Sequence, residues 1–420
     1  MDDVETAVPG FRSVPETGVI YVTKQAAKSG FSYESEDWSN LGQGSPEVGH
    51  LPGSPSRITS LKINPSQHSY SSVSGNIMLR EKVADYYNQI FRQGKSSKYT
   101  YENVSIAGGG RIALSRLAAA LGNINMGHFL PDYTAYEELL GIFKAFISIP
   151  ILLNNDSSYQ IGIDQLKQEV LGKGLRSLLV SNPCNPTGQV IEGERLKSWV
   201  DMAREMEFSI IFDEFYSHYI YSDLEENLGK MISAAAFVED VNTDPIIIVD
   251  GLTKNWRYPG WRMGWTLGPK EVIETVSSTG SFLDGGANHP FQVESCGLLD
   301  VALTMQETFA IQKRFSMKKE YLLERLEDLG IIVDAKPEGG FYIWANLSRL
   351  PSPLNDGFVF FEEGLKEKVI TVPGVFFDVN PARRRCVRRY QNYCRISFGP
   401  EMEKLEIGLE AIARVLKKFS

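Results

Sequence analysis

The most reactive side chain that the sequence predicts is the amine of Lys254. This lysine follows an apolar run at residues 246–249, which is typical of a strand buried in a parallel sheet. The amine is therefore expected at the carboxyl end of a strand, where open α/β sheets bind ligands. Burial and neighbouring cations lower the pKa of a lysine from ~10.4 toward neutrality, and the amine then becomes a nucleophile for carbonyl groups.

Two charged residues complement this lysine. Arg262 follows a turn at Pro259 and Gly260, and its guanidinium suits a carbonyl cofactor that carries a phosphate. Asp213 ends the apolar run at residues 209–212, and a carboxylate there needs a partner such as a protonated ring nitrogen. In the absence of a cofactor, Asp213 would be expected to cap the N-terminus of a helix.

A glycine-rich turn predicts a phosphate site. Residues 104–107 indicate a short strand, and Gly108-Gly109-Gly110-Arg111 then opens a helix. Glycines let backbone amides approach an anion at a helix N-terminus. Gly108, Gly110 and Ala113 also satisfy the G-x-G-x-x-A dinucleotide fingerprint, so a Rossmann dehydrogenase is an alternative, although such an enzyme does not need Lys254.

The most specific motif is Asn182-Pro183-Cys184-Asn185-Pro186-Thr187-Gly188. It follows a predicted strand at residues 178–180 and precedes an amphipathic helix at about 194–207. Two Asn-Pro pairs stop the strand and turn the chain, which presents the amide of Asn185 at the edge of the sheet.

Together these motifs resemble the class I/II aminotransferases, which are pyridoxal-phosphate (PLP) enzymes of fold type I. The resemblance extends from about Leu41 to Phe398. It implies that Lys254 holds PLP as a Schiff base and moves the proton, and that Asp213 keeps the ring nitrogen charged. Asn185 and Tyr216 are implied to bind the phenolic oxygen. The implied enzyme transfers an amino group from an L-amino acid to a 2-oxo acid.

The resemblance also implies which groups bind the rest of the cofactor. The implied phosphate ligands are the backbone amides of Gly110 and Arg111, the hydroxyl of Thr253 and the guanidinium of Arg262. The ring is implied to stack on Tyr133, and Tyr136 is the alternative. This chain has Gly251 where the family usually has a serine, so we expect weaker cofactor binding.

Substrate and subunit contacts complete the implied site. Arg395, in the run Arg395-Ile396-Ser397-Phe398, matches the family's arginine that binds the α-carboxylate of the substrate. Gly44 and Asn185 are implied to lie beside this carboxylate. Tyr70 matches a tyrosine that reaches the phosphate of the neighbouring subunit, so a homodimer with shared active sites is implied.

The amino donor is expected to lack a second acidic group. Enzymes for dicarboxylates place another arginine in the segment that corresponds to residues 272–292, and this chain has none there. Asp284, Asn288 and His289 are present instead, and a neutral or basic side chain is expected, the basic one through Asp284.

Other reactions of the same fold remain alternatives. A carbon-sulfur lyase, a decarboxylase or an amino-acid oxidase would use the same residues. A transcription regulator built on this fold would need a DNA-binding domain before Leu41, and we expect none.

Composition narrows the class of protein. The chain has 420 residues, of which 43% are hydrophobic and 23% charged, and a net charge of -9 disfavours nucleic acid as a partner. No apolar stretch reaches ~18 residues and no leader is evident, so we expect a cytoplasmic protein without a membrane span. Four scattered cysteines predict neither a disulfide framework nor a metal site. The arginines at 383–389 are interpreted as a solvated loop or a salt-bridged interface.

The predicted fold is α/β, with a mostly parallel sheet between helices and a smaller α+β domain. Residues 1–60 are expected to form an irregular arm and a small-domain segment, 61–305 the PLP-binding large domain, and 306–420 the C-terminal small domain. A long helix is predicted at about 307–329. Strands are predicted at 339–344 and, half-buried, at 393–398.

Overall fold

The computed structural model describes residues 11, 16, 18–222 and 227–419, and its largest sheet has seven strands in the order β2-β8-β7-β6-β5-β3-β4. The strands are β2 (Val104–Ala107), β3 (Asn125–Leu130), β4 (Ile147–Leu152), β5 (Leu175–Ser181), β6 (Ser209–Asp213), β7 (Ile246–Gly251) and β8 (Gly264–Leu267). β8 is antiparallel to both of its neighbours, and all other pairs are parallel. The mostly parallel α/β fold predicted from the sequence is confirmed.

Helices connect these strands and bury apolar faces against them. They are α3 (Gly110–Ala120), α4 (Tyr136–Ile142), α5 (Ile163–Lys173), α6 (Gly193–Glu205) and α7 (Lys270–Leu283). In α6, Leu196, Trp199, Val200 and Ala203 are buried at helical spacing. Every residue of β7 is buried, as expected for a central strand with both faces covered.

The register of three central strands places the site. Ser181 at the end of β5 pairs with Asp213 at the end of β6, and Asp213 pairs with Val249 of β7. The carboxyl ends of these strands therefore meet at one edge of the sheet. The loops that carry Asn185 and Lys254 leave from that edge.

Two smaller sheets form the rest of the structure. One has the order β12-β13-β10-β9, and the other pairs β1 with β11. Their strands are β1 (Ser39–Asn40), β9 (Ile332–Val333), β10 (Tyr342–Asn346), β11 (Val369–Ile370), β12 (Val372–Pro373) and β13 (Tyr393–Ser397). The β1–β11 pair joins the two ends of the chain.

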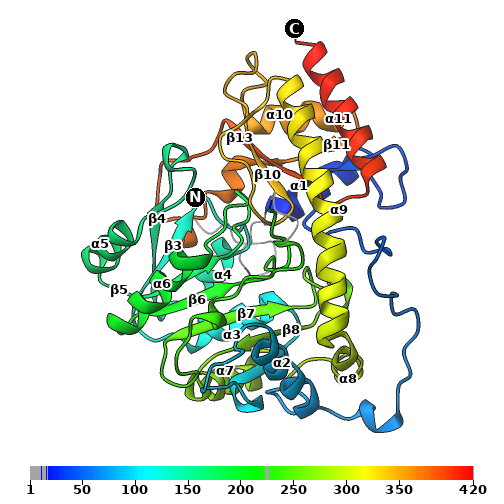
Figure 1. Cartoon of the computed structure of the whole chain (residues 1–420). Helices are drawn as coiled ribbons and strands as arrows, with labels where there is room; N and C mark the ends of the chain where they lie inside the picture. Colours follow the sequence, from blue (N-terminus) through cyan, green and yellow to red (C-terminus); the bar gives the residue numbers. More distant parts are fainter. Residues whose placement is uncertain (1–10, 12–15, 17, 223–226, 420) are drawn as a thin grey trace.

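Long and peripheral helices link these parts. They are α1 (Gly18–Lys28), α2 (Ile77–Ile90), α8 (His289–Leu298), α9 (Val301–Asp328), α10 (Gly357–Lys366) and α11 (Met402–Lys417). In Figure 1, α9 runs from the lower part, which holds the seven-stranded sheet, to the upper part with β10, β13, α10 and α11. The predicted long helix is present and begins earlier, where the side chain of Asp300 accepts a hydrogen bond from the Leu303 amide.

The expectation of an irregular arm at residues 1–60 is wrong where α1 and β1 form. In α1, Val22 and Ala26 lie one turn apart and are both buried. The helix is short, so this spacing gave little signal in the sequence. Residues 1–10, 12–15 and 17 of the predicted arm lie outside the described residues.

Two strand predictions also need correction. The strand predicted at 339–344 begins only at Tyr342, because Gly339 forms an isolated bridge with Ile220 and Gly340 bends the chain with a φ of 71°. The strand at 393–398 is not half-buried: Cys394, Arg395, Ile396 and Ser397 are all buried. Both faces of β13 are covered by the protein, and on its polar face Arg395 reaches the cavity residue Asn185.

No helix in the described part of the chain is long and apolar enough to cross a membrane.

Candidate active site

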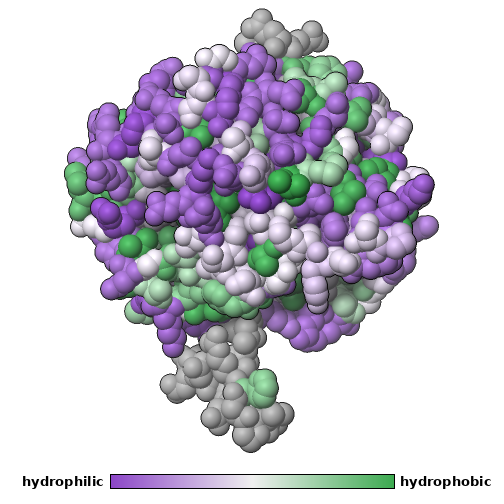
Figure 2. Space-filling model, turned by 90° about the horizontal axis from the view of Figure 1, so that it is seen from below, coloured by the Kyte–Doolittle hydropathy of each residue, from purple (hydrophilic) through white to green (hydrophobic). Residues whose placement is uncertain are grey.

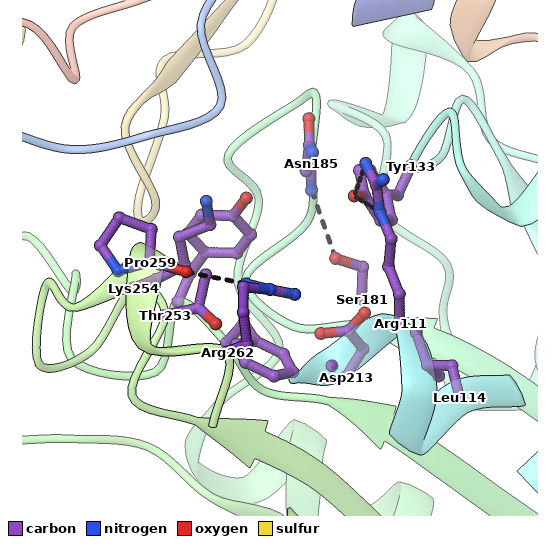
Figure 3. A pocket seen from close by; sticks show the side chains of 13 residues that line it. Arg111, Leu114, Tyr133, Ser181, Asn185, Asp213, Thr253, Lys254, Pro259 and Arg262 are labelled. Carbon is purple, nitrogen blue, oxygen red and sulfur yellow. Dashed lines mark hydrogen bonds between the residues drawn. The ribbon is translucent and has the colours of Figure 1, made fainter. Parts of the chain in front are cut away.

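A cavity of about 340 Å³ lies at the carboxyl ends of β5, β6 and β7. Figure 3 shows its side chains, which come from separate segments and point toward one another. The lining residues are Gly110, Arg111, Leu114, Tyr133, Ser181, Asn185, Asp213, Phe215, Tyr216, Thr253, Lys254, Pro259 and Arg262. All predicted site residues except Gly44, Tyr70 and Arg395 are among them.

Lys254 follows β7 and reaches into this cavity. Its amine donates a hydrogen bond to the carbonyl of Gly44 and lies 5.9 Å from the centre of the Phe341 ring. Burial, and then the positive charges of Arg395, Arg262 and Arg111, lower the pKa of Lys254 to about 7. A large fraction of the amine is therefore neutral near neutral pH, as a nucleophile for a carbonyl group requires.

Asp213 ends β6 and is buried beside the lysine. The hydroxyl of Tyr136 donates to its Oδ2 at 2.6 Å, and burial raises the pKa of Asp213 to about 6. Residues 214–219 form turns, so Asp213 does not cap a helix. Since only one carboxylate oxygen is used by Tyr136, the other can serve a positively charged ligand.

The structure separates the two candidate tyrosines. Tyr133 lines the cavity, and its hydroxyl accepts hydrogen bonds from Arg111 at 3.3 and 3.4 Å. Tyr136 is fully buried behind it and contacts Asp213. Tyr133 is thus the ring placed to contact a ligand, while the predicted stacking itself stays a prediction. No feature of the sequence indicated that Tyr136 is the partner of Asp213.

Asn185 and Tyr216 both line the cavity but do not contact each other's polar atoms. The Oδ1 atom of Asn185 accepts a hydrogen bond from Arg395 at 3.0 Å, and the Tyr216 hydroxyl lies 2.9 Å from the hydroxyl of Tyr342. The turn before Asn185 is held by Asn182, whose amide exchanges two hydrogen bonds of 2.8 Å with the backbone of Ile191. The first asparagine of the motif therefore positions the second.

One end of the cavity forms a cradle for an anion. Gly109 and Gly110 lie at the N-terminus of α3, and neither position has room for a side chain. A Cβ on Gly109 would lie 2.4 Å from Nη2 of Arg262, and a Cβ on Gly110 would lie 2.5 Å from the Phe215 ring. The hydroxyl of Thr253 is buried and has no hydrogen-bond partner among the described residues. The backbone amides that open α3, at Gly110 and Arg111, together with the Thr253 hydroxyl and the Arg262 guanidinium, fit a phosphate group.

Gly251 has a structural explanation. A Cβ at this position would lie 2.5 Å from Cα of Gly264 and from the carbonyl oxygen of Met263. Gly264 in turn lies against the anion cradle, since a Cβ added to Gly264 would be 3.1 Å from backbone atoms of Gly109 and Gly110. The backbones of β7 and β8 are thus too close for a serine at 251.

Two of the three predicted residues outside the lining still contact the cavity. Arg395 is 1% exposed and donates from Nη2 to the Gly42 carbonyl at 2.7 Å, and from Nη1 to Asn185. Gly44 accepts from Lys254. Tyr70, by contrast, is 97% exposed and lies on the outer surface, so it does not contribute to the site of its own chain.

The expectation for Asp284 is not met, because Asp284 pairs with the buried Arg116 at 2.5 Å and is not free to bind a basic substrate. In the arginine cluster at 383–389, Arg385 forms an ion pair with Asp378 at 2.7 Å. Trp38 and Trp256 are buried in the core, Trp261 is half-buried, and none of the three lines the cavity.

Comparison with known proteins places this geometry in a family. The family model described as aminotransferase class I and II matches residues 36–412. An aspartate aminotransferase of Pyrococcus horikoshii is 25% identical over 386 residues, which cover 91% of this chain and 90% of the relative. An aspartate/prephenate aminotransferase of Thermus thermophilus is 26% identical over 356 residues, which are 83% of each chain.

Solved structures agree in fold. An aspartate aminotransferase variant of Thermus thermophilus, complexed with tryptophan, superimposes with a TM-score of 0.78 at 22% identity and covers 96% of this chain and 97% of that chain. One from Thermotoga maritima gives a TM-score of 0.73 at 23% identity, over 96% and 98% of the chains. The fold is that of the fold-type I enzymes. The chain therefore belongs to the class I and II aminotransferases, a family that uses PLP, and it is an aminotransferase.

Proposed function

We propose that this enzyme binds PLP at Lys254 and transfers the amino group of an L-amino acid with a neutral side chain to a 2-oxo acid. The observation that carries the proposal is that Lys254, the anion cradle and Asp213 line one cavity. The unpaired Thr253 hydroxyl, Arg262 and the glycines of α3 fit a phosphate at one end, and Asp213 fits a charged ring nitrogen at the other.

The protein groups have distinct tasks in this proposal. Bound PLP supplies a carbon that accepts the amine and a ring that accepts the electron pair released at Cα. Asp213 holds a proton on the ring nitrogen, and Asn185 and Tyr216 bind the phenolic oxygen. Lys254 would take the proton from Cα and deliver it to the cofactor carbon that is bonded to the same nitrogen, for which its low pKa suits it. Tyr133 covers the ring.

Charge supports a substrate with a single carboxylate. Arg111 and Arg262 lie at the phosphate end, and Arg395, beside Asn185, suits an α-carboxylate, as do the adjoining Gly42 and Gly44 backbone groups. Within the described lining, this leaves no arginine or lysine for a second carboxylate. The relatives named above are aspartate and aspartate/prephenate aminotransferases, so the neutral donor is a specific point to test.

We also propose a homodimer in which Tyr70 reaches the phosphate end of the partner's cavity. Apolar side chains are exposed on α2 and α7, namely Ile77, Met78, Phe282 and Leu283, and Tyr70 lines an open cavity together with Asp284, the residue that follows α7. Figure 2 views the molecule from below, where α2 and α7 lie in Figure 1, and shows separate hydrophobic patches on a mostly hydrophilic surface. Light scattering of the purified enzyme tests the dimer.

The domain boundaries at residues 60 and 305, a cytoplasmic location and a role in biosynthesis stay predictions.

The central test is chemical. Borohydride reduction of the enzyme with PLP, followed by peptide mapping, should place the label on Lys254, and a label on another lysine would refute the site. Mixing the enzyme with single amino acids should give one 2-oxo acid per site and the pyridoxamine form of the cofactor. Ammonia, carbon dioxide or peroxide would instead indicate a lyase, a decarboxylase or an oxidase. Aspartate and glutamate far ahead of all other donors would refute the neutral side chain.

A further inference from the structure

Tyr342 lies where three predicted ligand-binding residues meet. It is 1% exposed, and its hydroxyl is 2.9 Å from that of Tyr216. The guanidinium carbon of Arg395 lies 4.1 Å from the centre of its ring. A Cβ built on Gly44 would be 3.6 Å from its hydroxyl oxygen. Among the described residues, Tyr342 is the side chain that contacts both Tyr216, by a hydrogen bond, and Arg395, by its ring.

The sheet register explains this position. β10 and β13 are antiparallel, with Trp344 opposite Arg395 and Tyr342 opposite Ser397. Side chains of directly paired residues, and of residues two positions away, share one face of a sheet. The Tyr342 ring is therefore the diagonal neighbour of Arg395, and the backbone holds the two together.

Arg395 keeps an uncompensated charge in this arrangement. Its described partners are the amide oxygen of Asn185 at 3.0 Å, the Gly42 carbonyl at 2.7 Å, the Tyr342 ring at 4.1 Å and, farther away, the Phe377 ring at 5.2 Å. None of these carries a full negative charge, and the Nε atom has no described partner. A cation over an aromatic face is held most firmly when it is shielded from water, as it is here. The ring can thus fix the guanidinium without neutralising it.

The hydroxyl of Tyr342 serves a different neighbour. Of the described residues, Tyr216 is its hydrogen-bond partner, and each of the two hydroxyls can donate. If Tyr342 donates, the proton of Tyr216 is free to point into the cavity. A hydroxyl that accepts one hydrogen bond also becomes a stronger donor in the next.

We propose that Tyr342 is a positioning residue with two separable parts: its ring orients Arg395 for the substrate carboxylate, and its hydroxyl donates to Tyr216 and directs the Tyr216 proton toward the phenolic oxygen of the cofactor. This inference rests on the proposed function, because it needs PLP and a carboxylate in the cavity. It adds a residue that the sequence motifs did not indicate.

The two parts can be tested with two variants. Tyr342→Phe keeps the ring and loses the hydroxyl. The pH midpoint of the visible absorption change of bound cofactor should rise by roughly 0.5 unit, as expected for the loss of one neutral hydrogen bond, and KM for the amino acid should change less than about threefold. Tyr342→Leu also loses the ring, and KM for the amino acid should rise roughly tenfold or more.

Tyr393→Phe is the matched control. Tyr393 lies on β13, and its hydroxyl donates to Asp334 at 2.7 Å, outside the cavity. The variant loses the same atom from the same pair of strands, and it should move neither the absorption midpoint nor KM. Circular dichroism checks that all variants are folded. Should the leucine variant fail to fold, the phenylalanine variant and its control still decide the role of the hydroxyl.

The outcomes separate this inference from the proposed function. If wild-type enzyme binds PLP at Lys254 but Tyr342→Phe matches Tyr393→Phe in the absorption midpoint, the role of the hydroxyl is refuted and the proposed function stands. If a folded Tyr342→Leu variant keeps the wild-type KM, the role of the ring is refuted. A wild-type enzyme that forms no absorption band with PLP would overturn the proposed function and this inference together.

Discussion

The two ends of the cavity differ in how far the chain completes them by itself. At the ring end, Asp213 is buried and already accepts a short hydrogen bond from Tyr136. At the phosphate end, Arg111 and Arg262 are exposed, and the Thr253 hydroxyl has no partner among the described residues. The ring end is thus organised before any ligand arrives, whereas the phosphate end needs a ligand, and by our proposal a second subunit, to satisfy its polar groups.

The largest effect is expected at the ring end. Asp213→Asn removes the charge that keeps the ring nitrogen protonated, so kcat should fall roughly 10²–10³-fold while PLP remains bound. Steady-state kinetics together with the cofactor absorbance measure this. Glu214→Gln is the control, since Glu214 is the neighbouring buried acid and does not line the cavity. An equal loss in both variants would point to a general effect on the fold.

The next effect belongs to the phosphate end. Arg262→Gln removes a charged hydrogen-bond donor, so the Kd of PLP should rise roughly 10–100-fold, while kcat at saturating PLP changes little. Equilibrium dialysis with PLP gives the Kd. Arg111→Gln should cost less, because the Arg111 guanidinium also bonds the Tyr133 hydroxyl. A larger rise in the Kd of PLP for Arg111→Gln than for Arg262→Gln would place the phosphate nearer to Arg111.

Gly251→Ser tests whether the phosphate end lacks a hydroxyl or lacks space. The added Cβ would meet the backbone of Gly264 at 2.5 Å, so the free energy of unfolding should fall by about 1–3 kcal/mol and PLP affinity should not improve. Thermal or urea unfolding measures the first quantity. Gly260→Ser is the control on the same loop, since a Cβ there meets nothing within 4 Å. Tighter PLP binding by Gly251→Ser would show that space is available.

The smallest effect is a shift in pH dependence. The neutral amine of Lys254 is the nucleophile, so the rate at which cofactor-free enzyme captures PLP should rise with pH and level off above the Lys254 pKa of about 7. Arg262→Gln should move this midpoint upward, because a positive charge that disfavours the lysine ammonium is removed. Stopped-flow absorbance gives the midpoint. A midpoint near 10 in the wild type would contradict the burial of the amine.

Contiguous motifs explain most of what the sequence predicted. Lys254, Asp213 and Asn185 each follow an apolar strand, and such strands end at the same edge of a parallel sheet, so their meeting could be expected. The contact of Tyr342 with Arg395 could not, because it depends on the register of two distant strands. Asp284 was misread for a similar reason: its partner Arg116 is far away in the sequence.

The missed helix α1 shows a different limit. Two of its three buried residues, Gly18 and Ala26, are small, so they do not mark an apolar face in the sequence. The burial of β13 on both faces also escaped prediction, because alternation of polar and apolar residues normally marks a strand with one wet face. Here the polar face is covered by the protein: Arg395 bonds Asn185 and Gly42, and Tyr393 bonds Asp334.

The contact between Gly251 and Gly264 has a consequence for the interpretation of sequence variation at these two positions. Positions 251 and 264 have no room for a side chain, so a saturation library selected for activity should retain glycine at both. Glycine retained at these positions could be mistaken for a requirement of the chemistry at the neighbouring Lys254. The cause would instead be the close approach of two paired antiparallel strands, β7 and β8, beside the anion cradle.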